Sequence, residues 1–158
     1  MKELILMMGV PGSGKSTYAR NILKYGDIYI SRDEIRYSML TDEDDYFAKE
    51  NEVIETFIQY IDEALVDTQH QGKVYADATH LSPKGRAQVL KQLKNKNKVS
   101  VIYLDIPLNV ILKRNAQREG RALVPETSIK NMYQSITLPR KEEGIKMTLW
   151  LNEDGSTK

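Results

Sequence analysis

Residues 9–17 read Gly-Val-Pro-Gly-Ser-Gly-Lys-Ser-Thr, and this stretch decides the fold of the 158-residue chain. It fits the pattern G-x4-G-K-[ST], in which glycines let the backbone curl so that its N–H groups point at phosphate oxygens. The apolar run Leu4–Met8 precedes it and a helical pattern begins at about Lys15, so it lies between a strand and a helix, as the pattern requires. A chance glycine-rich turn is the alternative, and these two flanking elements argue against it.

We expect this loop to bind a nucleoside triphosphate. Lys15 is expected to bridge the β- and γ-phosphates during transfer, and Ser16 to ligate Mg²⁺. The pattern alone does not separate kinases from ATPases or GTPases, but no Asn-Lys-x-Asp motif for guanine is present, which favours ATP. The residues expected to bind the nucleotide are Gly12, Ser13, Gly14, Lys15, Ser16 and Thr17.

Stretches typical of strands and helices alternate along the rest of the chain. We expect strands at 4–8, 28–30, 74–76, 99–104 and 145–151, and helices at about 15–25, from 31 onward, and at 46–69, 82–93, 107–118 and 127–136. This alternation predicts an α/β fold of the P-loop NTPase type, with a parallel sheet and helices on both faces. Residues 1–151 are expected to form the domain and 152–158 a polar C-terminal tail.

Composition excludes several kinds of site. Lys and Arg number 23 and Asp and Glu 22, so the net charge of +1 gives no bulk attraction for nucleic acid. The chain has no cysteine and two histidines, which excludes disulfides and makes a metal site built on thiolates or imidazoles unexpected. Its apolar run Leu4–Met8 is about a quarter of the roughly 20 residues that span a membrane. We expect a cytoplasmic protein.

The segment Ser31-Arg32-Asp33-Glu34-Ile35-Arg36 follows the second expected strand. In a parallel sheet the loops after the strands meet at one edge, so Asp33 is expected near the phosphate loop. A kinase needs a carboxylate to accept or orient the proton of the attacking hydroxyl, and Asp33 is the candidate, with Arg36 on the same helix face. The alternative is helix capping, for which Ser31 and Glu34 have the better spacing.

Asp77 and Asp105 each end an apolar strand and are the candidates for a second Mg²⁺ contact through water. We favour Asp77, because the polar turn Ala78-Thr79-His80 follows it. His80 is a candidate for contact with substrate, although a lone histidine is more often a structural hydrogen-bonding residue.

Arg114 and Arg118 are four residues apart on an expected helix and therefore point the same way. They belong to a locally basic segment, 113–121, that leads into Val124-Pro125 and is expected to form a mobile lid. Arginines in such a lid stabilise phosphoryl transfer by closing over the γ-phosphate. A solvated charged helix face is the alternative.

Five separated motifs together resemble the kinase domain of the polynucleotide 5′-hydroxyl kinases of phages and bacteria. The resemblance covers about residues 4–139. The motifs are Gly-x-Pro-Gly-Ser-Gly-Lys-Ser-Thr, Ser-Arg-Asp-x-x-Arg, Asp-Ala-Thr-x-Leu-Ser, Lys-Arg-Asn-x-x-Arg and Val-Pro-x-x-x-Ile-x-x-Met-Tyr.

The resemblance implies a role for each matched residue. Asp33 matches the general base, and Arg36 the residue that contacts the acceptor's scaffold phosphate and the reacting centre. Arg118, and with it Arg114, matches lid arginines on the ATP phosphates. Thr79 matches an acceptor contact. His80 is included among the acceptor contacts, although the family often has Asn there.

The main hypothesis is therefore transfer of the γ-phosphate of ATP to the 5′-hydroxyl of DNA or RNA, with Arg36 and an aromatic residue such as Tyr37 or Tyr46 contacting the acceptor. A kinase for a small-molecule hydroxyl, on a nucleoside, sugar or antibiotic, is the first alternative. A non-catalytic nucleotide-binding module is the second, and Asp33 and the paired arginines argue against it.

Overall fold

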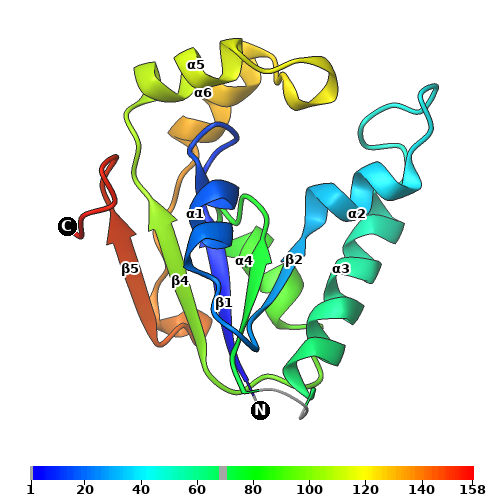
Figure 1. Cartoon of the computed structure of the whole chain (residues 1–158), viewed down its shortest axis with the longest axis vertical. Coiled ribbons are helices and arrows are strands. Elements are labelled where there is room, and N and C mark those ends of the chain that lie inside the picture. Colours follow the sequence, from blue (N-terminus) through cyan, green and yellow to red (C-terminus); the bar gives the residue numbers. More distant parts are fainter. Residues whose placement is uncertain (1, 68–70) are drawn as a thin grey trace.

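The computed structural model describes residues 2–67 and 71–158, and within these ranges it contains one five-stranded sheet. The strand order is β2-β3-β1-β4-β5, and neighbouring strands are all parallel (Figure 1). Central strands are apolar and buried on both faces, as parallel strands covered by helices must be. The strands are β1 Glu3–Met8, β2 Ile28–Ser31, β3 Lys73–Asp77, β4 Val99–Leu104 and β5 Met147–Leu151.

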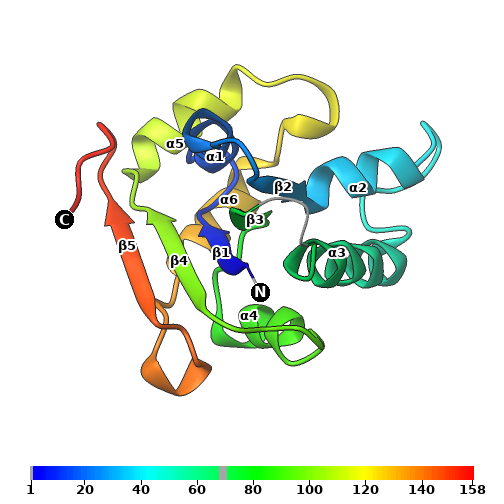
Figure 2. The ribbon, with the colours of Figure 1, turned by 60° about the horizontal axis from the view of Figure 1, so that its bottom comes forward.

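Helices cover both faces of the sheet, as predicted. One core cluster joins one face to helices α2, α3 and α4, and a second joins the opposite face to α1, α5 and α6. Figure 2 shows α3 and α4 on one side of the sheet and α1 and α5 on the other. The helices are α1 Lys15–Ile22, α2 Arg32–Met39, α3 Glu50–Leu65, α4 Pro83–Leu90, α5 Leu108–Ala116 and α6 Glu126–Gln134, and the short 3-10 helices are η1 Gly120–Ala122 and η2 Lys141–Glu143.

The starts of α1 and α2 bring the first site residues to the sheet edge. Gly12 and Gly14 both have φ near 90°, a conformation that glycine adopts without strain, and α1 begins directly after them. Ser31 caps α2 by accepting a hydrogen bond from the backbone N–H of Glu34 at 3.2 Å. The expected cap by Ser31 is therefore confirmed, whereas the carboxylate of Glu34 accepts from Arg20 instead of closing a capping box. Asp33 lies in the first turn of the helix.

One expected helix start differs in the structure. The helix expected from residue 46 begins at Glu50; the residues before it form turns, and the side chain of Tyr46 bonds to Asp33 on α2. Its expected end near Gln69 lies outside the described residues. Residues 152–158, expected as a polar tail, turn back along β5: the N–H of Asn152 donates to the carbonyl of Ser156 at 2.8 Å, and Leu151 pairs with Thr157.

No helix in the described parts of the chain has the length and apolar character needed to cross a membrane.

Candidate active site

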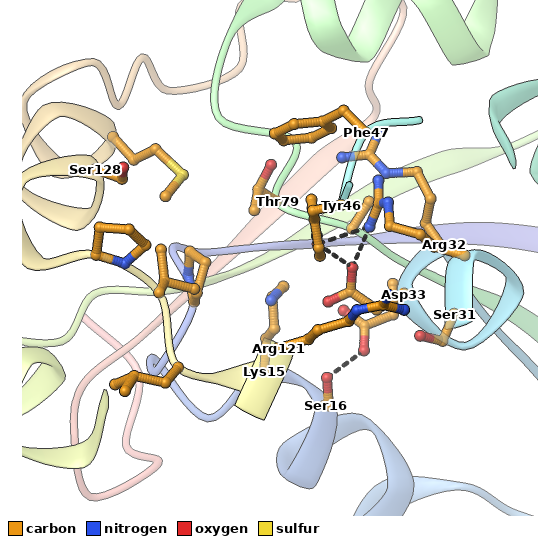
Figure 3. Close-up of a pocket in the computed structure, with 18 of the residues that line it drawn as sticks. Lys15, Ser16, Ser31, Arg32, Asp33, Tyr46, Phe47, Thr79, Arg121 and Ser128 are labelled. Carbon is orange, nitrogen blue, oxygen red and sulfur yellow. Dashed lines mark hydrogen bonds and ion pairs between the residues drawn. The ribbon is translucent and has the colours of Figure 1, made fainter. Parts of the chain in front are cut away.

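The carboxyl edge of the sheet holds a cavity of about 680 Å³ (Figure 3). The strand order sets the ends of β1, β2 and β3 side by side, so the phosphate loop, the start of α2 and the end of β3 all open into it. Lys15, Ser16, Asp33, Asp77 and Thr79 all line this cavity. The sequence-based expectation that these segments meet is therefore confirmed.

A hydroxyl and a carboxylate meet beside the phosphate loop. The Oγ of Ser16 donates to Oδ2 of Asp77 at 2.5 Å, and the hydroxyl of Tyr29 donates to the same oxygen. Burial, followed by the bond to Asp77, raises the pKa of Tyr29 to about 12, so the phenol stays a donor. Sequence reasoning missed Tyr29, because only the register of β2 against β3 brings it to Asp77.

These groups fit a magnesium ion. The second carboxylate oxygen of Asp77 is buried, and no described residue bonds to it. Hydroxyl and carboxylate oxygens beside a phosphate loop are the ligands that Mg²⁺ prefers. No cluster of three or more His, Asp or Glu side chains suited to a metal occurs in the described ranges, so Ser16, Asp77 and the bound phosphates would hold the ion. Asp105, the other candidate, instead bonds to Trp150 at 3.0 Å.

A buried network holds Asp33 at the cavity wall. Arg36, 2% exposed, donates to Glu50 through Nε and Nη2 at 2.7–3.0 Å. Its Nη1 donates to Asp33 and, at 2.7 Å, to the hydroxyl of Tyr46, which itself donates to Asp33 at 2.7 Å. Burial, and then the bond to Asp33, raises the pKa of Tyr46.

This network engages Arg36 with the protein itself. The guanidinium has five N–H groups, and protein oxygens already accept from all three of its nitrogens. Its plane also lies 4.3 Å from the ring centroid of Tyr46. Arg36 also lines the cavity, and in this structure its N–H groups are bonded to Glu50, Tyr46 and Asp33. The expected contact with an acceptor phosphate stays a prediction. Tyr46, expected as an aromatic acceptor contact, belongs to the same network and also lines the cavity.

His80, a candidate for contact with substrate, lies away from the cavity. Its side chain is buried and lies outside the cavity lining, while its neighbour Thr79 contributes to that lining. Nδ1 lies 2.7 Å from the carbonyl oxygen of Met7, and the ring stacks on Phe57 at 6.2 Å between centroids. Burial lowers the pKa of His80 to about 4, so the ring is neutral at pH 7. His80 is a structural residue here, as the alternative in the sequence analysis stated.

The phosphate loop separates the first cavity from a second one of about 500 Å³. Arg114 donates to the carbonyl of Ser13 at 3.1 Å, and both Arg114 and Arg118 line this second cavity. Residues 152–155 complete it, which the sequence analysis did not foresee. Four of the expected nucleotide-binding residues line it too: Gly12, Ser13, Gly14 and Thr17.

The lid segment also reaches the first cavity. Arg121, on η1, donates to the carbonyl oxygens of Thr41 and, at 3.0 Å, of Asp44, in the segment between α2 and α3. Phe47 and Leu123 line the same cavity and are 67% and 47% exposed. Sequence reasoning placed Arg121 only in the basic lid segment and assigned no role to Phe47 or Leu123, because nothing local in the sequence indicates that the two segments meet.

Comparison with known proteins agrees with this architecture. The family model AAA_33, described as AAA domain, matches residues 4–139. A curated relative, L-seryl-tRNA(Sec) kinase of Methanococcus maripaludis, is 32% identical over 146 residues, which are 86% of this chain and 53% of the relative. The chain thus spans about half the length of the curated relative.

Two solved structures share the fold. An unliganded sugar kinase from Janibacter sp. superposes with a TM-score of 0.67 at 20% identity, over 99% of this chain and 88% of the other. A chain of the Pnkp1/Rnl/Hen1 RNA repair complex superposes with a TM-score of 0.63 at 20% identity, over 85% of this chain and 43% of the other. At these identities the likeness shows the fold alone.

Proposed function

The chain belongs to the AAA domain family AAA_33 and is a kinase-like P-loop phosphotransferase, and on this premise we propose that it transfers the γ-phosphate of ATP to an alcohol hydroxyl of a small molecule. One observation carries the proposal. The carboxylate of Asp33 opens into the same cavity as Lys15 and Ser16, so a base and a phosphate-binding group face one enclosed space. A module that only binds nucleotide needs no such base.

The proposed step uses the chain's own groups. An acceptor hydroxyl lies against Asp33, which takes its proton as the hydroxyl oxygen attacks the γ-phosphorus. The bond from the γ-phosphorus to the bridging oxygen breaks, and ADP leaves with that oxygen. Lys15 neutralises charge on the transferred group, and Arg114 and Arg118 do so from the side of the second cavity. Mg²⁺, held at Ser16 and Asp77, supplies further charge neutralisation when bound.

Three observations favour a small acceptor over a polynucleotide end. Arg36, the residue that the resemblance assigns to an acceptor phosphate, is fully engaged inside the protein. The cavity is bounded on one side by the lid segment and on another by the segment between α2 and α3, and Arg121 links these two segments. The net charge is +1, which gives little attraction for a nucleic-acid backbone. The names of the relatives, a seryl-tRNA kinase and a sugar kinase, agree with an alcohol acceptor.

A polynucleotide 5′-hydroxyl is the second candidate, and Phe47 is the observation that favours it. This ring is 67% exposed at the cavity wall, where a nucleobase could stack on it. The five sequence motifs resemble the polynucleotide kinases as well.

A panel of acceptors tests the proposal. The protein is incubated with ATP labelled at the γ-phosphate and with nucleosides, sugars, sugar acids, serine-type alcohols, and DNA and RNA oligonucleotides that carry 5′-hydroxyls. We expect label on one class of small alcohol, and none with Asp33→Asn. Label found only on oligonucleotide ends would support the second candidate, a polynucleotide 5′-hydroxyl kinase, instead of the first. ATP hydrolysis without transfer to any alcohol would contradict both.

A further inference from the structure

Arg32 is a cation in the acceptor cavity that has no partner within residues 2–67 and 71–158. It lines the cavity, yet no hydrogen bond or ion pair of its guanidinium occurs there. The other arginines near the cavity differ: Arg36 donates to Asp33 and Glu50, and Arg121 donates to two backbone carbonyls. Arg32 therefore has five N–H donors free for a ligand.

The surroundings of Arg32 compensate its charge only at a distance: the charges of Asp33 and Glu50 favour the protonated guanidinium, but neither carboxylate bonds to it. Asp33 and Glu50, the acids nearest to it, are bonded to Arg36, which is itself a like charge beside Arg32. Burial, and next the charge of Arg36, lowers the pKa of Arg32, while the guanidinium remains protonated. Partly buried charge without a partner is unfavourable, so binding an anion here would relieve that cost.

We propose that Arg32 binds an anionic oxygen group of the acceptor, a phosphate ester or a carboxylate, so that the site selects alcohols that carry an anion close to the reacting hydroxyl. A planar guanidinium binds either group through two parallel hydrogen bonds. That the selected molecule is an alcohol which accepts a phosphate rests on the proposed function. Binding of an anion by Arg32 does not, because it requires no phosphoryl transfer.

The arrangement of the cavity supports this assignment. Arg32 and Asp33 are neighbours in the first turn of α2, so one helix end presents both the anion-binding group and the base. In Figure 3 both lie on the same side of the cavity as Phe47, and Ser128 lies across from them. Thr79 and Ser128 provide neutral polar groups for the rest of the acceptor.

Binding without chemistry gives the direct test. The intact protein is saturated with Mg²⁺ and a non-hydrolysable ATP analogue, which fills the phosphate loop and keeps other anions out of it. Two matched pairs are then titrated by calorimetry: adenosine 3′-monophosphate against adenosine, and gluconate against glucose. We expect at least one anionic member to bind about tenfold or more tightly than its neutral partner, as for a charge-assisted pair. The preferred pair identifies phosphate or carboxylate as the group.

Substitution assigns the preference to Arg32. Arg32→Gln should reduce the preference to about threefold or less, and Arg32→Lys should retain part of it, since lysine keeps the charge but not the paired bonds. Arg140→Gln, which removes the same charge from an exposed residue outside both cavities, should leave it unchanged. Melting temperature and affinity for the ATP analogue check that Arg32→Gln is folded.

Three results would overturn the anion site: equal binding of both members of each pair, a preference that survives Arg32→Gln, or no binding of any member at millimolar concentration. Failure of the proposed function is a separate outcome. If the protein shows the Arg32-dependent preference but transfers no phosphate to any alcohol, the anion site is supported and the proposed kinase activity is wrong.

Discussion

Arg36 matches a motif residue, and in this structure its hydrogen bonds are with the protein itself. Its spacing from Asp33 predicted a shared helix face, which is correct, but Glu50 and Tyr46 come from a different helix and a different loop. No local sequence pattern predicts that Glu50 and Tyr46 both contact Arg36. The phosphate loop, by contrast, could be predicted in full, because all of its parts are contiguous in the chain.

Arg36→Lys tests whether Arg36 positions Asp33. Lysine keeps the charge but cannot bind Glu50 through two parallel bonds while also reaching Asp33. We expect kcat to fall by about 10²-fold, because a misplaced base costs that order of rate, while KM for the acceptor changes by less than about threefold. Steady-state kinetics with the best acceptor measure both, with Arg140→Lys as the matched control. A large rise in KM at unchanged kcat would instead show that Arg36 binds the acceptor.

His80 predicts a pH dependence of stability. Its pKa is about 4 in the folded protein and 6.5 for a solvent-exposed imidazole, so between these values the unfolded chain binds the proton and the native state does not. Stability is therefore full above pH 6.5 and falls, by roughly 3 kcal/mol, as the pH drops toward 4. Urea unfolding across this range measures the fall.

The variant His80→Asn removes this titrating group. Asparagine tolerates the positive φ of 49° at this position, and its amide can donate to the carbonyl of Met7. We expect a flatter stability profile between pH 6.5 and 4 and phosphotransfer within about threefold of the unsubstituted protein, since His80 does not line the cavity. An unchanged slope would mean that other groups cause the pH dependence.

At the scale of elements, two segments far apart in the sequence close the acceptor cavity. Arg121 on η1 joins the lid to the segment between α2 and α3 through the carbonyls of Thr41 and Asp44. Hydrophobic periodicity predicted the helices on either side, but it carries no information about contacts between loops. For the same reason the start of α3 at Glu50 was missed by four residues.

Arg121→Ala tests this closure. Without the two hydrogen bonds the segments lose their link, so the acceptor should bind less tightly. We expect KM for the acceptor to rise by about tenfold, the cost of one charge-assisted hydrogen bond, and the affinity for ATP to stay within about twofold. Acceptor kinetics and nucleotide titration provide the two readouts. If the affinity for ATP fell by as much as the affinity for the acceptor, Arg121 would instead contribute to nucleotide binding.

For the whole molecule, the strand order determines where the site lies. The alternation of apolar runs and helical stretches predicted the parallel sheet and the edge on which Asp33 and Asp77 meet. It did not predict the buried ion pair between Arg86, 0% exposed, and Glu143 at 2.7 Å, which joins α4 to η2 behind the site. Arg86 also donates to the carbonyl of His80 at 2.8 Å, next in the chain to Thr79, which lines the cavity.

Arg86→Met should therefore destabilise the whole domain. Removing Arg86 leaves the largely buried carboxylate of Glu143 with the backbone N–H of Arg140 as its remaining donor, which costs up to about 3–5 kcal/mol. Urea denaturation measures this loss, and the double variant Arg86→Met with Glu143→Gln should recover part of it, because the unpaired charge is gone. A loss below about 1 kcal/mol in the single variant would show that the pair contributes little to stability.

The most direct test of the central claim is single-turnover phosphotransfer by Asp33→Asn with labelled ATP and the best acceptor. The amide keeps the shape of the side chain but cannot take the proton, so we predict that transfer slows by about 10²- to 10⁴-fold while ATP affinity is unchanged. Arg140→Gln should transfer at the original rate. Transfer by Asp33→Asn within about threefold of the unsubstituted protein would contradict the assignment of this cavity as the site of phosphorylation.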